Sequence, residues 1–138
     1  MKVNFCHKTT LRVRYGETDQ MGYCYYGNYA QYFEVGRVEA LREIGMSYKS
    51  LEEKGVMLPV SDFQVQYKYP AKYDDELCIE TCIIEINGPR LKFEYTITNQ
   101  ENVLIATATT TLVFVSKEDM KPIRPPQVFL DVMEKYCL

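Results

Sequence analysis

The chain has 138 residues and a formal net charge of −3, with 46% hydrophobic and 25% charged residues. This length fits one domain, 1–138, and leaves no room for two domains of ordinary size. A weakly acidic chain lacks the basic surface that nucleic-acid binding requires, so we expect no nucleic-acid partner. No apolar run approaches the ~20 residues of a membrane span, and the first residues do not contain the apolar core of a secretory signal.

The first predicted element is a strand over residues 8–15, where apolar and polar side chains alternate. A glycine-containing loop, 16–27, follows it. Asn28 is a favoured N-cap residue, and apolar side chains then recur every three to four positions, which predicts a helix over 28–44. A glycine ends that helix, and a short second helix is predicted over 47–54.

The second half of the chain reads as strands over 59–69, 76–86, 90–98 and 103–116, with a C-terminal helix beginning at Pro126. Short connections between these strands predict antiparallel meanders. The element order therefore indicates an α+β fold, in which a sheet of about five antiparallel strands packs on one long helix. The second face of that sheet and its edges would be uncovered, which favours a partner subunit.

The five cysteines are odd in number and follow no metal-binding pattern. Cys78 and Cys82 are the closest pair, and on a strand this spacing of four residues separates them by about 13 Å. That distance prevents a bond or a shared metal, and a single histidine makes a zinc site improbable. We therefore expect reduced thiols, a cytoplasmic protein, and neither a metal nor a cofactor.

His7, the only histidine, precedes the first predicted strand, where we interpret it as a solvated residue near the terminus. A Ser–His–Asp or Cys–His site would have to use it. The chain also has no Walker-type loop and no GxGxxG motif, so nucleotide chemistry of those classes is not expected.

The remaining candidate is the loop that joins the first strand to the long helix. It carries the carboxylates of Glu17 and Asp19 and leads into a helix N-terminus. Free backbone N–H groups at such a terminus polarise a carbonyl and hold the oxyanion that forms when the carbonyl is attacked. A carboxylate and an oxyanion site together are sufficient for acyl hydrolysis. The structural alternative is that Asp19 caps a turn and the glycines only permit the bend.

The stretch RVRYGETDQMGYCYYGNYAQYFEVGR resembles the signature of the 4-hydroxybenzoyl-CoA thioesterase-like acyl-CoA thioesterases. The family pattern falls on Asp19, Gly22, Asn28-Tyr29 and Phe33-Glu34, and the segment PAKYDDELCIET resembles the approach to the family's central strand. The likeness extends over about residues 8–125. It implies a hotdog fold, with five antiparallel strands wrapped around the long helix and a homodimer or homotetramer as the working unit.

The resemblance also implies hydrolysis of an acyl-CoA thioester, or of an acyl carrier protein thioester in its place. Asp19 would act as base or nucleophile, and the backbone N–H of Tyr26 would bind the thioester carbonyl. Many bacterial members of the family have His at the position of Tyr26, and a backbone role survives this difference while an imidazole role does not.

Five further residues are candidates for substrate binding. Gly22 permits a positive φ or a close approach of the backbone, and Asn28 orients the loop or caps the helix. Tyr25 lines an acyl cleft or packs in an interface, whereas Arg90 and Lys92 contact the phosphates of coenzyme A or lie on a solvated strand edge.

Two other functions of the same fold stay open at this stage. A hotdog hydratase or dehydratase acts on acyl thioesters but usually relies on a catalytic His. A non-catalytic module would bind acyl thioesters without turning them over.

Overall fold

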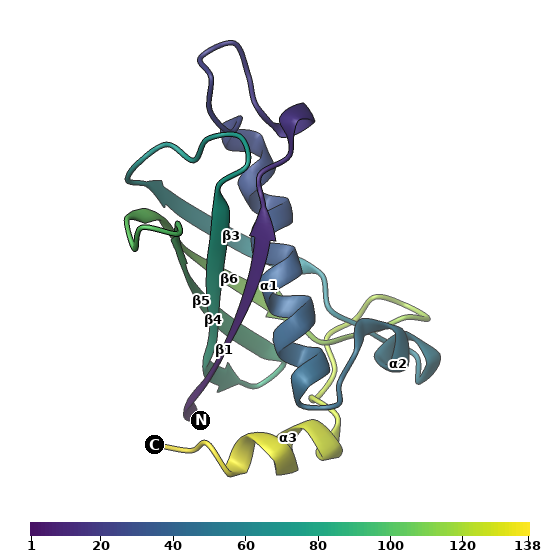
Figure 1. Ribbon diagram of the computed structural model, residues 1–138. Helices are drawn as coiled ribbons and strands as arrows, with labels where there is room; N and C mark the ends of the chain where they lie inside the picture. The colour runs from purple at the N-terminus through teal and green to yellow at the C-terminus, as the bar shows by residue number, and fades with distance from the viewer.

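The computed structural model describes all residues 1–138, and its ribbon shows a sheet with one long helix and several shorter elements (Figure 1). In chain order the elements are β1 (Lys2–Arg12), the 3₁₀ turns η1 (Tyr15–Glu17) and η2 (Tyr26–Asn28), α1 (Tyr29–Glu43), α2 (Tyr48–Glu53), β2 (Val56–Met57), β3 (Val60–Tyr67), β4 (Glu76–Asn87), β5 (Arg90–Thr98), β6 (Leu104–Val113), β7 (Val115–Ser116) and α3 (Gln127–Glu134).

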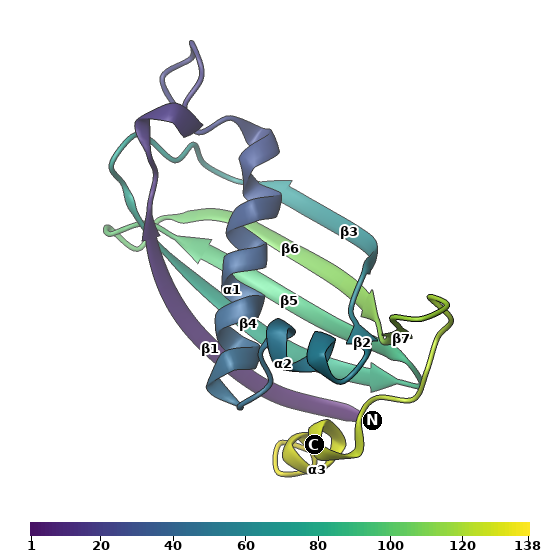
Figure 2. The ribbon, with the colours of Figure 1, turned by 90° about the vertical axis from the view of Figure 1, so that its right-hand side faces the viewer.

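A five-stranded antiparallel sheet in the order β1-β4-β5-β6-β3 packs against α1, which lies across one of its faces (Figure 2). The predicted α+β arrangement is thus confirmed. The meander prediction is right for β4, β5 and β6 only, because β3 pairs with β6 and forms an edge of the sheet. The chain must therefore cross the sheet to reach β4.

Two predicted strands and the interpretation of His7 differ from the structure. β1 begins at Lys2, since Val3 and Phe5 already alternate into the core. His7 therefore lies inside β1, with its Nε2 3.8 Å from a carboxylate oxygen of Glu43, and the interpretation as a solvated terminal residue is wrong. The strand predicted over 103–116 divides at Phe114, whose N–H donates to a carbonyl at the β4–β5 turn instead of continuing the ladder.

The helix α1 turns its aromatic side chains towards the sheet. Tyr29, Tyr32 and Phe33 are all nearly fully buried, and the ring of Phe33 lies 4.9 Å from that of Tyr95 on β5. Burying large aromatic surfaces is the main favourable contribution at such a helix–sheet contact. The start of α1 is therefore held firmly against the sheet.

Gly36 is the point of closest approach between α1 and β4. A Cβ atom there would lie 2.4 Å from Oγ1 of Thr81 and 2.8 Å from Cγ2 of Ile79. Both neighbours are stiff β-branched side chains, so neither yields easily. We expect Gly36→Val to lower the free energy of unfolding by about 1–3 kcal/mol, the usual cost of overpacking.

Urea denaturation measures this effect. The matched control is Gly16→Ala, because a Cβ at Gly16 meets nothing within 4 Å and its φ is not positive. Equal losses in the two variants would contradict the close packing of α1 on β4.

Cys6 and Cys82 form a disulfide between β1 and β4, where they are directly opposite partners with Cα atoms 4.1 Å apart. The expectation of five reduced thiols is wrong for this pair. Spacing within one strand says nothing about which residue of another strand lies opposite, and that register decides whether two cysteines can bond. The three remaining cysteines, Cys24, Cys78 and Cys137, are free.

The longest helix, α1, has 15 residues, and no helix of the structure reaches the length and apolarity of a membrane span.

Candidate active site

The loop between β1 and α1 lies at the end of the sheet where β1 ends and α1 begins, and it projects beyond the strands (Figure 1). Two backbone hydrogen bonds join the first half of this loop to its second half. The N–H of Asp19 donates to the carbonyl of Tyr23 at 3.0 Å, and the N–H of Tyr25 donates to the carbonyl of Glu17 at 2.9 Å. Asp19 therefore stands on a hydrogen-bonded hairpin, held next to the N-terminus of α1.

Asp19 opens a tight turn at the tip of this hairpin. Its carbonyl accepts from the N–H of Gly22 at 3.0 Å, and its Oδ1 accepts from the N–H of Met21 at 2.9 Å. Gly22 has φ +87°, a conformation that favours glycine, as the sequence predicted. The turn-capping alternative is thus correct for Oδ1, whereas Oδ2 of Asp19 has no hydrogen-bond partner in the protein.

A cavity of about 270 Å³ joins this loop to the end of β3. Asp19 and Tyr26 both line it, and its walls are mostly aromatic: the rings of Tyr29 and Tyr67 are 5.1 Å apart, and those of Tyr26 and Tyr67 are 6.2 Å apart. The full lining is Asp19, Met21, Tyr23, Cys24, Tyr26, Tyr29, Tyr67, Lys68, Tyr69 and Pro70.

The helix begins directly at this cavity, through the 3₁₀ turn η2 that runs into α1. The carbonyl of Tyr26 accepts from the hydroxyl of Tyr67 at 3.2 Å, but the N–H groups of Tyr26 and Gly27 have no backbone partner. Unpaired N–H groups and the positive end of the helix dipole favour a negatively charged oxygen there. The cavity thus combines a carboxylate with candidate oxyanion donors.

Two other predicted residues lie beside this cavity without lining it. The Tyr25 ring packs on Tyr26 with centroids 4.8 Å apart and covers Gly27. Asn28 precedes α1 but makes no side-chain cap; its Nδ2 donates to the carbonyl of Glu17 at 2.8 Å. Of the two roles considered for Asn28, the structure favours orientation of the loop.

Arg90 and Lys92 are not brought to Asp19 within one chain. They begin β5, opposite Asn87 and Glu85, whereas the loop adjoins the other end of the sheet. The cation that does line the cavity is Lys68, which follows β3.

Sequence reasoning missed the contribution of the segment Tyr67–Pro70. Its position depends on β3 being an edge strand whose last residues meet the start of α1, and no local motif encodes that strand order. The one available signal was composition, because twelve tyrosines and no tryptophan suggest aromatic clefts with polar tips.

Cys24 is a nucleophile by type and lines the same cavity, but its environment disfavours the thiolate. Burial raises the pKa of the Cys24 thiol above its ordinary value, with Glu17 and Asp19 adding to the effect. A cysteine acts as a nucleophile when its pKa is lowered by a cation or a histidine, and this one is raised. The raised pKa therefore disfavours Cys24 as the nucleophile.

We expect iodoacetamide at mildly alkaline pH to label the exposed Cys137 readily and to leave Cys24 unmodified until the protein is unfolded. A raised pKa means less thiolate at a given pH, and burial adds steric protection. Peptide mass spectrometry gives the labelling rate of each site. Labelling of Cys24 as fast as Cys137 in the folded protein would contradict this assignment.

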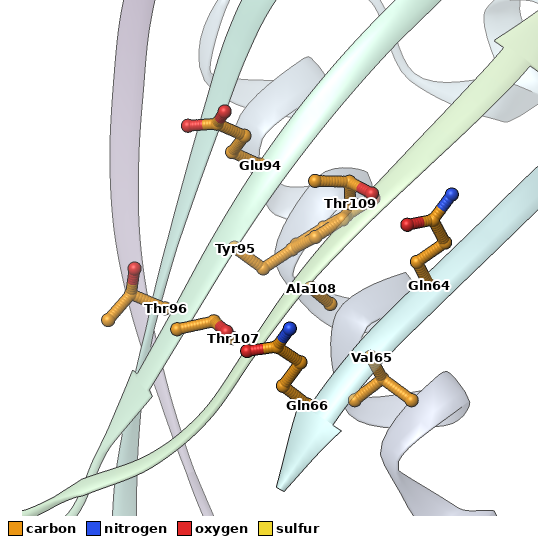
Figure 3. A pocket seen from close by; sticks show the side chains of 9 residues that line it. All are labelled: Gln64, Val65, Gln66, Glu94, Tyr95, Thr96, Thr107, Ala108 and Thr109. Carbon is orange, nitrogen blue, oxygen red and sulfur yellow. The ribbon is translucent and has the colours of Figure 1, made fainter. Parts of the chain in front are cut away.

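A second cavity, of about 410 Å³, lies on the face of the sheet that α1 does not cover. Figure 3 shows hydroxyl and amide side chains of β3, β5 and β6 there, with Glu94 as the only carboxylate. None of the predicted site residues lines it. No group of three or more His, Cys, Asp or Glu side chains is arranged to hold a metal ion.

Comparisons with known proteins identify the family of this chain. The profile of the thioesterase-like superfamily matches residues 13–133. The putative acyl-CoA thioesterase YneP of Bacillus subtilis is 39% identical over 124 residues, covering 90% of each chain. The acyl-CoA thioester hydrolase YbgC of Escherichia coli is 37% identical over 112 residues, covering 81% of this chain and 84% of its own.

A solved structure of a thioesterase has the same fold as this chain. The DHNA-CoA thioesterase from Staphylococcus aureus superposes with a TM-score of 0.87 at 35% identity, covering 94% of this chain and 87% of its own. The chain therefore belongs to the thioesterase-like superfamily, within the hotdog-fold acyl-CoA thioesterases whose signature its sequence resembles.

Proposed function

We propose that this protein hydrolyses acyl-CoA thioesters to the free acid and coenzyme A, with Asp19 as the reacting carboxylate and the N–H of Tyr26 as oxyanion donor. The observation that carries the proposal is that Asp19 and Tyr26 line one cavity at the start of α1. The names of the relatives support the reaction class.

The chemistry follows from the arrangement of these groups. The thioester carbonyl oxygen would accept from the Tyr26 N–H, so that negative charge gathers where the helix terminus stabilises it. Asp19 would take a proton from an attacking water, and the tetrahedral intermediate would expel the thiolate. A thiolate leaves readily, so the step requires no strong general acid and no histidine.

The second route open to Asp19 is direct attack on the thioester. The carboxylate oxygen would bond to the acyl carbon and expel the thiolate, giving a mixed anhydride that water then opens. Single-turnover hydrolysis in ¹⁸O-water distinguishes the routes. Direct attack of water places ¹⁸O in the acid at the first turnover, whereas an anhydride opened at the Asp19 carbon leaves ¹⁸O on the protein.

Free coenzyme A is the carrier that we propose, and an acyl carrier protein is the alternative. An acyl carrier protein is acidic and would require a basic rim around the cavity of its partner enzyme. This chain has a net charge of −3, which gives no indication of such a rim. Lys68 at the cavity is one cation within reach of an anionic end of the substrate.

A homodimer formed through β3 is the assembly that we propose. β3 is an edge strand of eight residues, and its large apolar side chains Val60, Phe63 and Tyr67 are 40–48% exposed. An unpaired apolar edge favours pairing with a second copy. Light scattering should give twice the chain mass of 16.1 kDa, and a monomer would contradict the assembly.

The single domain over 1–138, the cytoplasmic location and a tetramer as the larger assembly stay predictions. The Cys6–Cys82 disulfide is the one structural feature that argues against a reducing compartment.

The experiment that tests the proposed reaction is thiol release from a panel of acyl-CoAs and acyl carrier protein thioesters. We expect release of coenzyme A with stoichiometric free acid. Hydration of an enoyl-CoA without thiol release would assign the hydratase function instead, and binding without either product would assign the non-catalytic module.

A further inference from the structure

Glu17 is a nearly buried carboxylate next to the proposed site, and both of its carboxylate oxygens have partners within the protein. Its side chain is only 12% exposed, although it stands on a surface loop. Oε1 accepts from the hydroxyl of Tyr32 and from the N–H of Arg14, each at 2.8 Å. Oε2 lies 3.4 Å from two nitrogens of the Arg14 guanidinium.

The main chain of Glu17 is held equally firmly. Its carbonyl accepts from the N–H of Tyr25 at 2.9 Å and from Nδ2 of Asn28 at 2.8 Å. Glu17 is therefore hydrogen-bonded to three segments, which are the residues after β1, the second half of the loop, and α1. Tyr32, its partner on α1, is itself 2% exposed, so the anchor point is part of the core.

Asp19 and Tyr26 both depend on this anchor. Asp19 is two residues after Glu17, at the tip of the hairpin whose stem is the Glu17–Tyr25 hydrogen bond. Tyr26 follows Tyr25 directly on the other side of that stem. A shift of Glu17 relative to Tyr32 thus moves both groups relative to each other and to α1.

Glu17 does not line the cavity that contains Asp19. It lines a separate polar hollow, together with Arg14, Gly16, Asn28 and Gln31. With its oxygens occupied and its side chain outside the cavity, Glu17 does not line the space in which we place the thioester.

We infer that Glu17 and Tyr32 form a positioning pair, which sets the geometry of Asp19 and Tyr26 for thioester hydrolysis without touching the substrate. This inference rests on the proposed function. Because Tyr32 lies on the rigid helix and Glu17 on the loop, their hydrogen bond fixes the loop that carries the reacting groups.

The first test compares variants at the two positions. We expect Tyr32→Phe to lower kcat by about 10-fold and Glu17→Ala by about 30-fold, while KM changes by less than about 2-fold, because misplaced groups cost rate rather than affinity. Glu17→Gln keeps an acceptor oxygen for the Tyr32 hydroxyl and should restore most of the activity that Glu17→Ala loses.

A matched control separates positioning from loss of stability. Tyr48 is a half-buried tyrosine on α2 whose hydroxyl accepts from Nε of Arg37, in the second half of α1, at 3.0 Å. Tyr48→Phe removes a comparable hydrogen bond far from the loop and should leave kcat unchanged. Equal losses of kcat in Tyr48→Phe and Tyr32→Phe would overturn the inference.

The decisive measurement repeats the Tyr32→Phe and Glu17→Ala substitutions in the Asp19→Asn background. Because the pair positions Asp19 as well as Tyr26, its effect on kcat should be clearly smaller in that background, where only the share that acts through Tyr26 remains. Effects that multiply in full would overturn the inference. Failure of the proposed function has a different signature, because the wild type would then release no thiol. Wild-type turnover with full activity in both Glu17→Ala and Tyr32→Phe would remove only the positioning pair.

Discussion

Asp19→Asn should lower kcat for acyl-CoA hydrolysis by at least ~100-fold while the protein stays folded, because the amide can neither accept a proton nor attack the thioester. Because the amide oxygen can still accept the turn hydrogen bond from the N–H of Met21, we expect the loop to keep its conformation. Thiol release under saturating substrate measures the loss, and urea denaturation checks the fold.

Asp119→Asn is the control that the chain itself offers. The Oδ1 of Asp119 accepts from the N–H two residues later, at 3.1 Å, in the same kind of turn as Asp19, but no predicted site residue lies near it. We expect wild-type kcat in this variant. A turnover near that of the wild type in Asp19→Asn would remove Asp19 from the mechanism.

Cys6→Ser should lower the free energy of unfolding by about 4 kcal/mol under oxidising conditions, because the disulfide closes a loop of 76 residues in the unfolded chain. The bond also ties β1, an edge strand, to its only neighbour in the sheet. Urea unfolding of the oxidised protein with and without reductant measures the effect, and the mass of the intact protein reports the bond.

Cys137→Ser is the control for this prediction, since Cys137 is exposed and free. Reductant should shift the unfolding midpoint of Cys137→Ser and of the wild type alike, and should leave Cys6→Ser unchanged. An unfolding midpoint of the wild type that does not respond to reductant would contradict a stabilising disulfide.

The parts of the fold that could be predicted are those encoded locally. The strand over Arg90–Thr98 alternates strictly and was predicted to the residue, and the helix after Asn28 follows from its apolar spacing and the glycine that ends it. β3 shows the limit of this reasoning. Its residues predict a strand, but nothing local says that it pairs with β6 at the edge of the sheet.

The candidate site divides in the same way. Asp19, Gly22 and the start of α1 lie within one continuous segment, so their proximity follows from the sequence and the resemblance. Tyr67 and Lys68 reach the cavity only through the strand order of the sheet. A linear sequence also does not show which end of a strand faces a loop, so it could not place Arg90 at the end of the sheet opposite to the loop of Asp19. Cross-strand register likewise hid the Cys6–Cys82 pair.

A crystal structure of this protein with a coenzyme A analogue, in which a methylene ketone replaces the thioester, tests most directly whether Asp19 and Tyr26 face the reacting carbonyl. We expect the ketone oxygen at about 3 Å from the Tyr26 nitrogen, the distance of an oxyanion-hole donor, with the carbonyl carbon facing Asp19. An analogue bound with its carbonyl outside this cavity, or turned away from both groups, would contradict this expectation.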